Sequence, residues 1–205
     1  MRKATLLKVI FLAFAALVLS PQLYASDAVI GEKALDFTAT DSNGKTQNLT
    51  SYKGKTVVLE WLNHQCPFVK KHYGSGSMQK LQKAYTGKGV IWFSVISSAP
   101  GKMGYCTPEE ANSLVREKGA APTSVLLDAQ GIVGKLYGAK TTPHMSIVNA
   151  DGVLVYNGAI DDTPSQDIAD MATAKNYVQT ALDELLAGKQ ISVGTSRPYG
   201  CPVTY

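Results

Sequence analysis

Residues 56–67 read Thr-Val-Val-Leu-Glu-Trp-Leu-Asn-His-Gln-Cys-Pro, and this stretch decides the fold. Its first seven residues form a nearly continuous apolar run with β-branched residues, which is typical of a strand covered on both faces. Pro67 is a favoured first residue of a helix, so the residues before it form the turn. The stretch predicts a buried strand that leads into a helix, with Cys66 at the junction.

Strand and helix patterns alternate on both sides of this stretch. Strands are predicted at 35–40, 45–49, 56–62, 90–96, 124–128, 145–149 and 153–157. Helices are predicted from Pro67 to the break at 74–76, from Ser77 to Tyr85, and at 107–118, 131–137 and 174–187, with a helical turn at 49–54 and an acidic loop at 158–170. This order predicts an α/β fold with a central mixed sheet, parallel in the middle and antiparallel at one edge, flanked by helices.

The first 25 residues have the pattern of a secretory signal. They begin with three basic residues, Arg2, Lys3 and Lys8. An apolar run follows at 10–19, shorter than the roughly 20 residues that a spanning helix needs. We therefore expect cleavage after Ala25, a periplasmic or secreted location, and no stable membrane anchor.

Residues 26–188 have a length that suits one domain with a sizeable core, and 189–205 form a tail without a clear pattern. The formal net charge of +4 falls by three, to +1, once the basic residues of the signal are removed. Since no basic stripe is apparent in the sequence, we expect no nucleic-acid partner.

The chain has three cysteines: Cys66, Cys106 and Cys201. In an oxidising compartment disulfides persist, and an odd count means that one thiol is unpaired, pairs outside the chain, or cycles. No two cysteines have the Cys-x-x-Cys spacing. The dithiol redox motif and the common zinc ribbon are therefore excluded.

Cys66 has the position expected of an activated thiol. The start of a helix offers unpaired backbone N–H groups and the positive end of the helix dipole, and both favour the thiolate. Such sites lower a cysteine pKa from about 8.5 to roughly 3.5–7.5. Pro67 has no N–H, so the donor must be Phe68 or Val69. We expect an exposed, reactive Cys66; a small buried side chain or half of a static disulfide are the alternatives.

His64 and His144 are candidates for helping Cys66 to ionise. Alternatively, His64 is a solvated turn residue and His144 a hydrogen-bonded structural residue, while His72 is expected on the helix surface. His64, Cys66 and His144 together suggest a copper site as a minor alternative. We predict neither a metal nor a cofactor.

A single reactive thiolate needs a second thiol to resolve its product. The 13 residue steps from Gly188 to Cys201 can extend about 43 Å, and a domain of this size is about 30–35 Å across. The tail can therefore bring Cys201 to Cys66. Because it also contains Tyr199, Tyr205 and two prolines, we prefer a docked tail to a disordered one. Cys106 is the alternative resolving residue; otherwise it is a loop cysteine before a capped helix.

Four features resemble the redoxin branch of the thioredoxin superfamily, which includes the alkyl hydroperoxide reductase and thiol-specific antioxidant group. They are the hairpin that starts at 31–37 and turns at Asn43-Gly44, the Cys66 junction, the strand–helix stretch at 125–138, and Thr142-Pro143. The resemblance implies a thioredoxin-like fold with an N-terminal β-hairpin and a redoxin-type strand–helix insertion. It also implies that Pro143 is cis and faces Cys66, with the Thr142 backbone free to pair with a bound peptide or thiol substrate.

The sequence departs from the resembled families at three places. Val69 stands where thioredoxins have their second cysteine, and Asn63 stands where peroxiredoxins have a threonine. The peroxiredoxin arginine is also missing near the proline, where 140–144 read Lys-Thr-Thr-Pro-His. Neither the disulfide-exchange nor the peroxidase set of residues is complete.

We therefore predict an exported thiol–disulfide or antioxidant oxidoreductase that uses Cys66 and resolves through Cys201. Asn63, His64, Pro67, Thr142, Pro143 and His144 would support it. Its partners would be a thiol, disulfide or peroxide substrate and an external thiol reductant. The alternatives are a one-cysteine thiol peroxidase, or a non-catalytic peptide-binding or structural module in which Cys66–Cys201 is a permanent disulfide.

Overall fold

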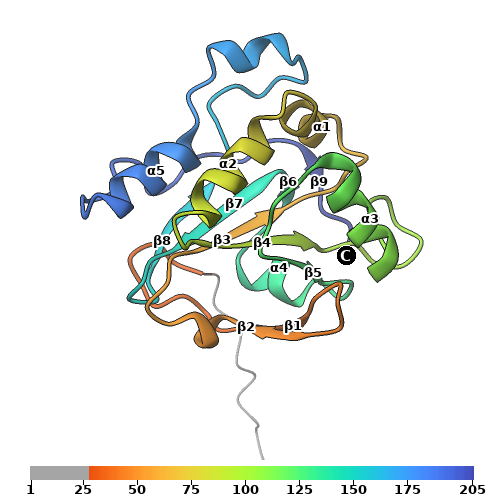
Figure 1. The fold of residues 1–205 in the computed structure, drawn as a ribbon, viewed down its shortest axis with the longest axis horizontal. Helices are drawn as coiled ribbons and strands as arrows, with labels where there is room; N and C mark the ends of the chain where they lie inside the picture. Colours follow the sequence, from red (N-terminus) through yellow and green to blue (C-terminus); the bar gives the residue numbers. More distant parts are fainter. Residues whose placement is uncertain (1–27) are drawn as a thin grey trace, which may run out of the picture.

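The computed structural model describes residues 28–205, so the signal peptide predicted at 1–25 lies outside the described residues. A five-stranded sheet with the order β5-β4-β3-β7-β8 forms the centre (Figure 1). Its strands are β3 (Val57–Trp61), β4 (Ile91–Ile96), β5 (Ser124–Leu127), β7 (His144–Val148) and β8 (Leu154–Gly158). β3, β4 and β5 are parallel, while β7 and β8 run antiparallel. The predicted mixed sheet is confirmed.

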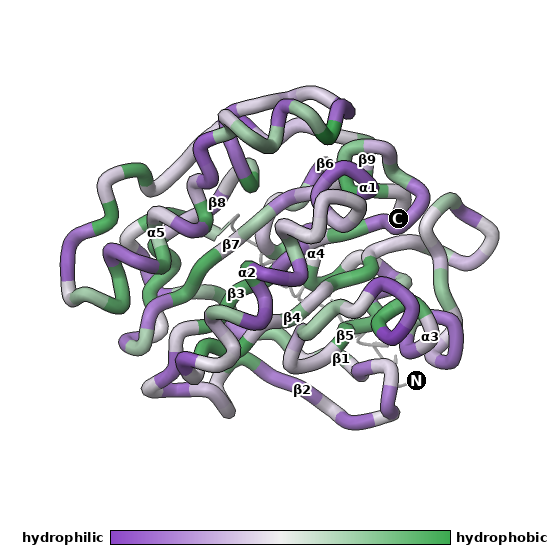
Figure 2. The backbone as a smooth tube through the Cα atoms, turned by 45° about the horizontal axis from the view of Figure 1, so that its top comes forward, coloured by the Kyte–Doolittle hydropathy of each residue, from purple (hydrophilic) through white to green (hydrophobic). Residues whose placement is uncertain are grey.

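Each face of the sheet is covered by its own layer, because successive residues of β3 point to opposite sides. Val58 packs in the same cluster as side chains of α1 (Pro67–Gly74), α2 (Ser77–Thr86), α3 (Pro108–Lys118) and α5 (Tyr177–Leu186). Leu59 and Trp61 pack with α4 (Ile132–Leu136) and with the segment around the hairpin β1 (Thr38–Thr40)–β2 (Thr46–Asn48). In Figure 2 the central strands are mostly hydrophobic and the outer turns hydrophilic.

Most of the predicted elements are present, including the hairpin, the helical turn η1 (Leu49–Tyr52) and the strand–helix unit β5–α4. The capping box predicted at α3 is formed by Thr107 and Glu110. Two predictions were wrong by three residues at one boundary: the first strand begins at Thr38, not at 35, and the last helix begins at Tyr177, not at 174. The Asn176 side chain accepts the Gln179 N–H and caps the helix there, with Asn176 itself in extended backbone.

Three short elements were not predicted. They are η2 (Ala169–Ala172) in the acidic loop, and the strands β6 (Thr141–Thr142) and β9 (Cys201–Pro202). β6 and β9 pair antiparallel, with Thr142 opposite Cys201. A pair of two-residue strands has no period for a sequence pattern to reveal. This ladder nevertheless docks the tail at the carboxyl end of the sheet.

Glu60 is a fully buried carboxylate in the middle of β3. It accepts hydrogen bonds from Trp92 Nε1 at 2.7 Å, Tyr73 Oη at 2.8 Å, Gln82 Nε2 at 2.9 Å and Ser94 Oγ at 3.2 Å. Buried charges require such partners. The network joins β3 to β4, α1 and α2 beneath the helical layer.

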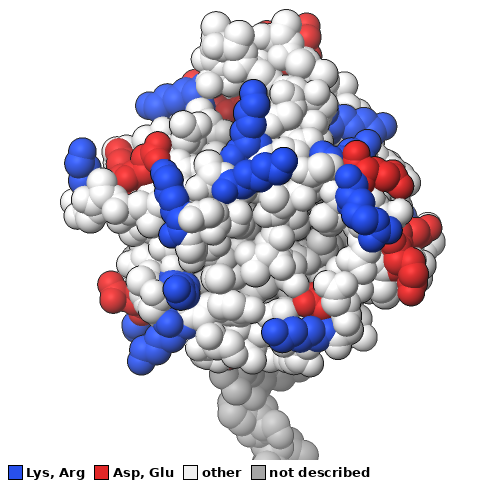
Figure 3. Space-filling model, in the orientation of Figure 1, with Lys and Arg blue, Asp and Glu red and all other residues white. Residues whose placement is uncertain are grey.

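Charged side chains of both signs are scattered over the face shown in Figure 3, without a continuous stripe of one sign. Within residues 28–205 no helix has the length and apolar character needed to cross a bilayer.

Candidate active site

Cys66 lies at the N-cap of α1, directly after the turn that follows β3. Its N–H donates to Asn63 O at 2.9 Å, and its thiol donates to Thr142 O at 3.2 Å. The side chain is 0 % exposed. The expectation of an exposed thiol was therefore wrong for this state, because the tail lies over the rim and Cys201 contacts the Cys66 sulfur.

Opposing effects act on the pKa of Cys66. Burial raises it, while hydrogen bonds from the Cys201 thiol, the Val69 N–H and the Cys201 N–H lower it, and the net pKa is below the ordinary value. The N–H of Val69 is one of the two donors expected at the start of the helix. The thiolate of Cys66 is thus stabilised jointly by α1 and by the tail.

The pKa of Cys201 is shifted in the opposite direction to that of Cys66. Burial, its hydrogen bond to Cys66 and the negative charge of Cys66 raise the pKa of Cys201 to about 12. Of the two thiols, Cys66 is therefore the one that ionises first as pH rises. This asymmetry is what an attacking thiolate and a resolving thiol require.

Cys106 lies in a different environment. Its thiol contacts Gly104 O at 3.6 Å within its own loop. Burial and the charge of Glu110 raise its pKa. Of the two candidate resolving thiols, Cys201 is the one hydrogen-bonded to Cys66.

The expected cis bond between Thr142 and Pro143 is present. Thr142 pairs with Cys201 across the β6–β9 ladder, and its carbonyl also accepts from Cys66. The chain's own tail thus occupies the backbone position that the sequence assigned to a bound substrate.

Of the two histidines that were candidates for helping Cys66, His144 has the hydrogen-bonded structural role given as its alternative. His144 is buried, and its Nε2 lies 2.5 Å from Asn157 Oδ1. His64 packs edge-on against Tyr73 with 5.3 Å between ring centroids. Burial lowers the pKa of both, and with the charge of Lys118 it brings His64 to about 4. Both rings are neutral at neutral pH, so neither supplies a positive charge to Cys66.

Asn63 shapes the turn before Cys66. Its Oδ1 accepts the Gln65 N–H at 2.8 Å, and its Nδ2 donates to Met103 O at 3.4 Å. Gly104, with φ +90°, leaves room for this side chain, since a Cβ there would lie 2.5 Å from Asn63. Asn63 therefore has a structural role between two loops.

The family model of the redoxins matches residues 30–175. The chain belongs to the redoxin family. Among solved structures, an uncharacterized conserved protein from Geobacillus kaustophilus is 26% identical, with a TM-score of 0.75 over 86% of this chain and 92% of that one. No curated protein sequence matches this redoxin.

Two further structures share the fold at lower identity. A putative thiol:disulfide interchange protein DsbE from Chlorobium tepidum is 22% identical, with a TM-score of 0.51 over 64% of this chain and 85% of that one. The thioredoxin domain of a thiol-disulfide oxidoreductase from Bacteroides vulgatus is 19% identical, with a TM-score of 0.50 over 71% and 96%. The predicted thioredoxin-like fold is confirmed.

Sequence reasoning missed how this redoxin holds its tail. His72, expected on the surface, is 0 % exposed because it lies under the tail residue Tyr199. Near the end of the tail, Tyr205 Oη donates to Ala139 O at 2.6 Å. The acidic loop is visible in the sequence, but no sequence pattern connects its Asp161 with Tyr199, which donates to it in the fold. Only the aromatic residues of the tail hinted that it packs.

Within the described part of the redoxin chain, no three His, Cys, Asp or Glu side chains gather closely enough to hold a metal ion. The copper ligands considered in the sequence, His64, Cys66 and His144, are therefore not assembled.

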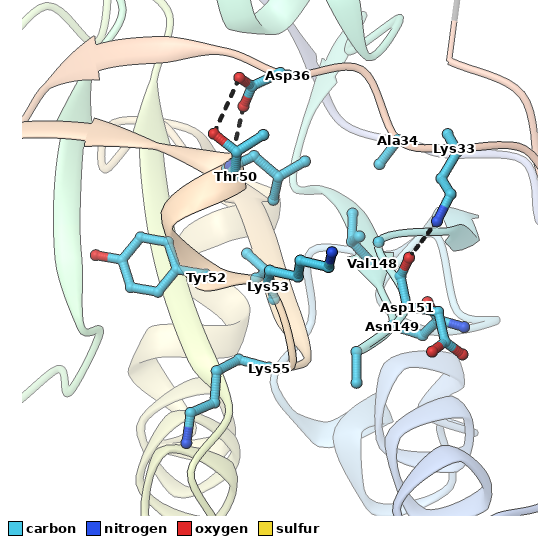
Figure 4. Close-up of a pocket in the computed structure, with 14 residues that line it drawn as sticks. Lys33, Ala34, Asp36, Thr50, Tyr52, Lys53, Lys55, Val148, Asn149 and Asp151 are labelled. Atoms are coloured by element: carbon cyan, nitrogen blue, oxygen red, sulfur yellow. Dashed lines mark hydrogen bonds between the residues drawn. The ribbon is translucent and has the colours of Figure 1, made fainter.

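A hollow of about 200 Å³ lies between the hairpin side of the redoxin domain and the β7–β8 turn. It is lined by Val57, at the amino end of β3, and so lies at the opposite end of that strand from Cys66. Three lysines line it, but Lys33 donates to Asp151 O and Lys55 points away (Figure 4). The ammonium groups of the three lysines do not converge on one position. Because the hollow lies at the other end of β3, it is separate from the thiol site.

Proposed function

We propose that this redoxin is an exported thiol oxidoreductase that cycles between a Cys66–Cys201 dithiol and the corresponding disulfide. The observation that carries the proposal is that both thiols meet Thr142, which precedes Pro143: its carbonyl accepts from the Cys66 thiol at 3.2 Å, and its backbone pairs with Cys201 across the β6–β9 ladder. The lowered pKa of Cys66 and the raised pKa of Cys201 support it. Export rests on the signal pattern at 1–25 and belongs to the same proposal.

The chemistry balances for a disulfide substrate. The Cys66 thiolate attacks one sulfur, forms a mixed disulfide and releases the first substrate thiolate. Cys201 then loses its proton and attacks the Cys66 sulfur, which releases the second substrate thiolate and closes the Cys66–Cys201 bond. Two electrons have passed to the substrate, and an external thiol returns them to the protein.

A peroxide substrate would give a sulfenic acid at Cys66 and an alcohol, and Cys201 would then displace water. The donors that polarise a peroxide in peroxiredoxins are absent from the sequence, and Asn63 is engaged with Gln65 and Met103. We therefore favour disulfide exchange over peroxide reduction.

The decisive experiment is disulfide mapping of the oxidised mature protein, combined with turnover of a model disulfide by Cys66→Ser and Cys201→Ser. We expect a Cys66–Cys201 bond, no thiol-dependent turnover in Cys66→Ser, and an accumulated mixed disulfide in Cys201→Ser. Unchanged turnover in Cys66→Ser, or a Cys66–Cys106 bond, would contradict the proposal. A reduction potential below about −300 mV would indicate a permanent structural disulfide instead.

A further inference from the structure

Tyr199 precedes Cys201 by two residues, and its ring lies on the helix that begins next to Cys66. The ring packs edge-on against Phe68 of α1, with centroids 5.7 Å apart. The ammonium group of Lys71, one turn further along α1, lies 5.5 Å from the ring centroid. One rigid helix therefore carries both Cys66 and the contact surface for the tail.

The hydroxyl of Tyr199 reaches a buried polar cluster. The hydroxyl donates to Asp161 Oδ1, and His72 Nε2 lies 3.3 Å from the hydroxyl oxygen of Tyr199. Asp161, Lys71 and His72 are each exposed by 1 % or less. We name Phe68, Lys71, His72 and Asp161 the tyrosine seat.

Asp161 depends on the tail for a hydrogen bond. Its Oδ1 accepts from the Thr163 N–H at 3.0 Å and from Tyr199, while Oδ2 has no hydrogen-bond partner and lies 3.8 Å from both Lys71 Nζ and His72 Nε2. Removing the Tyr199 hydroxyl would leave this buried carboxylate with a single hydrogen-bond donor, the Thr163 N–H. Such charge-assisted bonds are the stronger class of hydrogen bond.

The connection from Tyr199 to Cys201 has no slack. Gly200 packs so closely on Thr142 that a Cβ at Gly200 would lie 1.9 Å from the Thr142 carbonyl oxygen. A hollow of about 560 Å³ beside the seat is lined by Asp161, Tyr199 and Gly200. The ring of Tyr199 therefore borders open space on one side and the tyrosine seat on the other.

We propose that Tyr199, bound in the tyrosine seat, is the positioning residue that holds Cys201 against Cys66 and sets how often the tail lifts to expose Cys66. The role of Tyr199 in positioning Cys201 rests on the proposed function of the Cys66–Cys201 pair. The binding of Tyr199 in the tyrosine seat can be tested separately, in a chain that lacks Cys201.

The test compares Tyr199→Phe with its parent in a full-length Cys201→Ser background. Cys66 is 0 % exposed while the tail is docked, so iodoacetamide reacts with it in the open fraction. We expect alkylation of Cys66, followed by peptide mapping, to accelerate about tenfold, the factor that corresponds to one hydrogen bond to a charged group. An unchanged rate would overturn the proposal.

Tyr85→Phe is the matched control, because Tyr85 Oη donates to Asp183 Oδ1 at 2.8 Å on the α2–α5 side of the molecule. It should leave the alkylation rate of Cys66 unchanged; equal acceleration by both variants would mean general loosening and overturn the proposal.

A double-mutant comparison tests the Tyr199–Asp161 bond itself. In an Asp161→Asn background the effect of Tyr199→Phe on the alkylation rate should shrink. Independent, multiplicative effects of the two changes would exclude the Tyr199–Asp161 bond as the seat.

A second readout uses the chain with all three cysteines. Tyr199→Phe should make the Cys66–Cys201 disulfide easier to reduce. The disulfide holds the oxidised tail in the weakened seat, so the oxidised form bears the whole loss, whereas the reduced tail can undock and avoid part of it. An unchanged reduction potential would show that the seat does not position Cys201. If oxidation yields no Cys66–Cys201 bond in the unmodified chain, the proposed function fails while the alkylation result stands by itself.

Discussion

At the scale of single residues, the Cys66 sulfur is controlled by donors from two distant parts of the chain. The Val69 N–H belongs to the helix after Cys66, while the Cys201 thiol and N–H belong to the tail. Burial alone would raise the pKa of Cys66. The hydrogen bonds from the tail therefore help to offset the effect of burial on the pKa of Cys66.

Replacing Cys201 by Ala tests this dependence. The variant loses the thiol donor to Cys66, so we expect the pKa of Cys66 to rise towards that of an ordinary cysteine. The measurement is the pH midpoint of Cys66 alkylation, followed by peptide mapping; the midpoint reports ionisation, whereas the maximal rate also reports tail opening. Cys106→Ala is the control and should not move the midpoint. Equal midpoints in all three proteins would contradict the assignment.

Glu60 shows how a buried charge affects stability. Burial raises the pKa of Glu60, and its four hydrogen bonds, the one from Trp92 first, act to lower it. The folded-state pKa stays above the unfolded value. The contribution of Glu60 to stability is therefore greatest below its unfolded pKa and is lost as pH rises through its folded pKa.

Trp92→Phe removes the indole donor to Glu60, and we expect a loss of about 2–3 kcal/mol in the free energy of unfolding at neutral pH. Since the lost bond favours the ionised carboxylate, the deficit should grow as pH rises. Urea unfolding between acidic and neutral pH measures it. Trp61→Phe is the control, because Trp61 is equally buried but donates to the neutral Ser97 at 3.1 Å. A pH-independent deficit in Trp92→Phe would contradict the role of Glu60.

At the scale of elements, β6 and β9 fix the tail more firmly than their two-residue lengths suggest. Thr142 pairs with Cys201, and just beyond the ladder the Val203 N–H donates to Lys140 O at 3.0 Å. Gly200 permits this approach because it has φ +134° and no side chain to meet the Thr142 carbonyl. The ladder places Cys201 opposite the residue that precedes Pro143.

Gly200→Ala should separate β9 from β6. A Cβ 1.9 Å from a carbonyl oxygen forces the backbone to move, so we expect Cys66 alkylation to accelerate at least about tenfold, as for the loss of one or two hydrogen bonds. Oxidative closure of the Cys66–Cys201 bond should slow in parallel. Gly188→Ala is the control, since Gly188 also has positive φ, +68°, but open space around its Cβ. Similar alkylation rates in the two variants would contradict the steric argument.

At the scale of the whole molecule, the tail (189–205) contacts segments that follow the central strands of the sheet. Ala99 N–H donates to Thr204 O at 3.0 Å, so the tail also contacts the loop after β4. A Cys66–Cys201 bond would close a loop that includes most of the described chain. Cross-links over long loops stabilise mainly by restricting the unfolded state.

Oxidation should therefore raise the thermal midpoint by roughly 5–15 °C, which corresponds to about 2–4 kcal/mol in a chain of this size. Thermal unfolding with and without a reductant measures the shift. Cys106→Ser should keep the shift and Cys201→Ser should lose it. A shift that persists in Cys201→Ser would assign the stabilisation to a different disulfide.

The local sequence determined the central strand, the Cys66 junction and most helices of this redoxin. Apolar continuity fixed β3, Pro67 fixed the start of α1, and Thr107 with Glu110 fixed the start of α3. These signals act between residues a few positions apart, so a pattern in the sequence contains them. The same locality explains why Val69 could be anticipated as a donor to Cys66.

Tertiary structure decided between Cys201, which the sequence favoured, and Cys106 as the thiol that meets Cys66. It alone decided how deeply Cys66 is buried and what role His72 has. Each depends on segments far apart in the sequence: β9 pairs with β6, and Tyr199 covers His72 and Asp161. Contacts of this kind arise from packing and buried hydrogen bonds, which leave no periodic pattern along the chain. The sequence determined where Cys66 lies along the chain, while the folded tail decided which groups contact its sulfur and how far it is exposed.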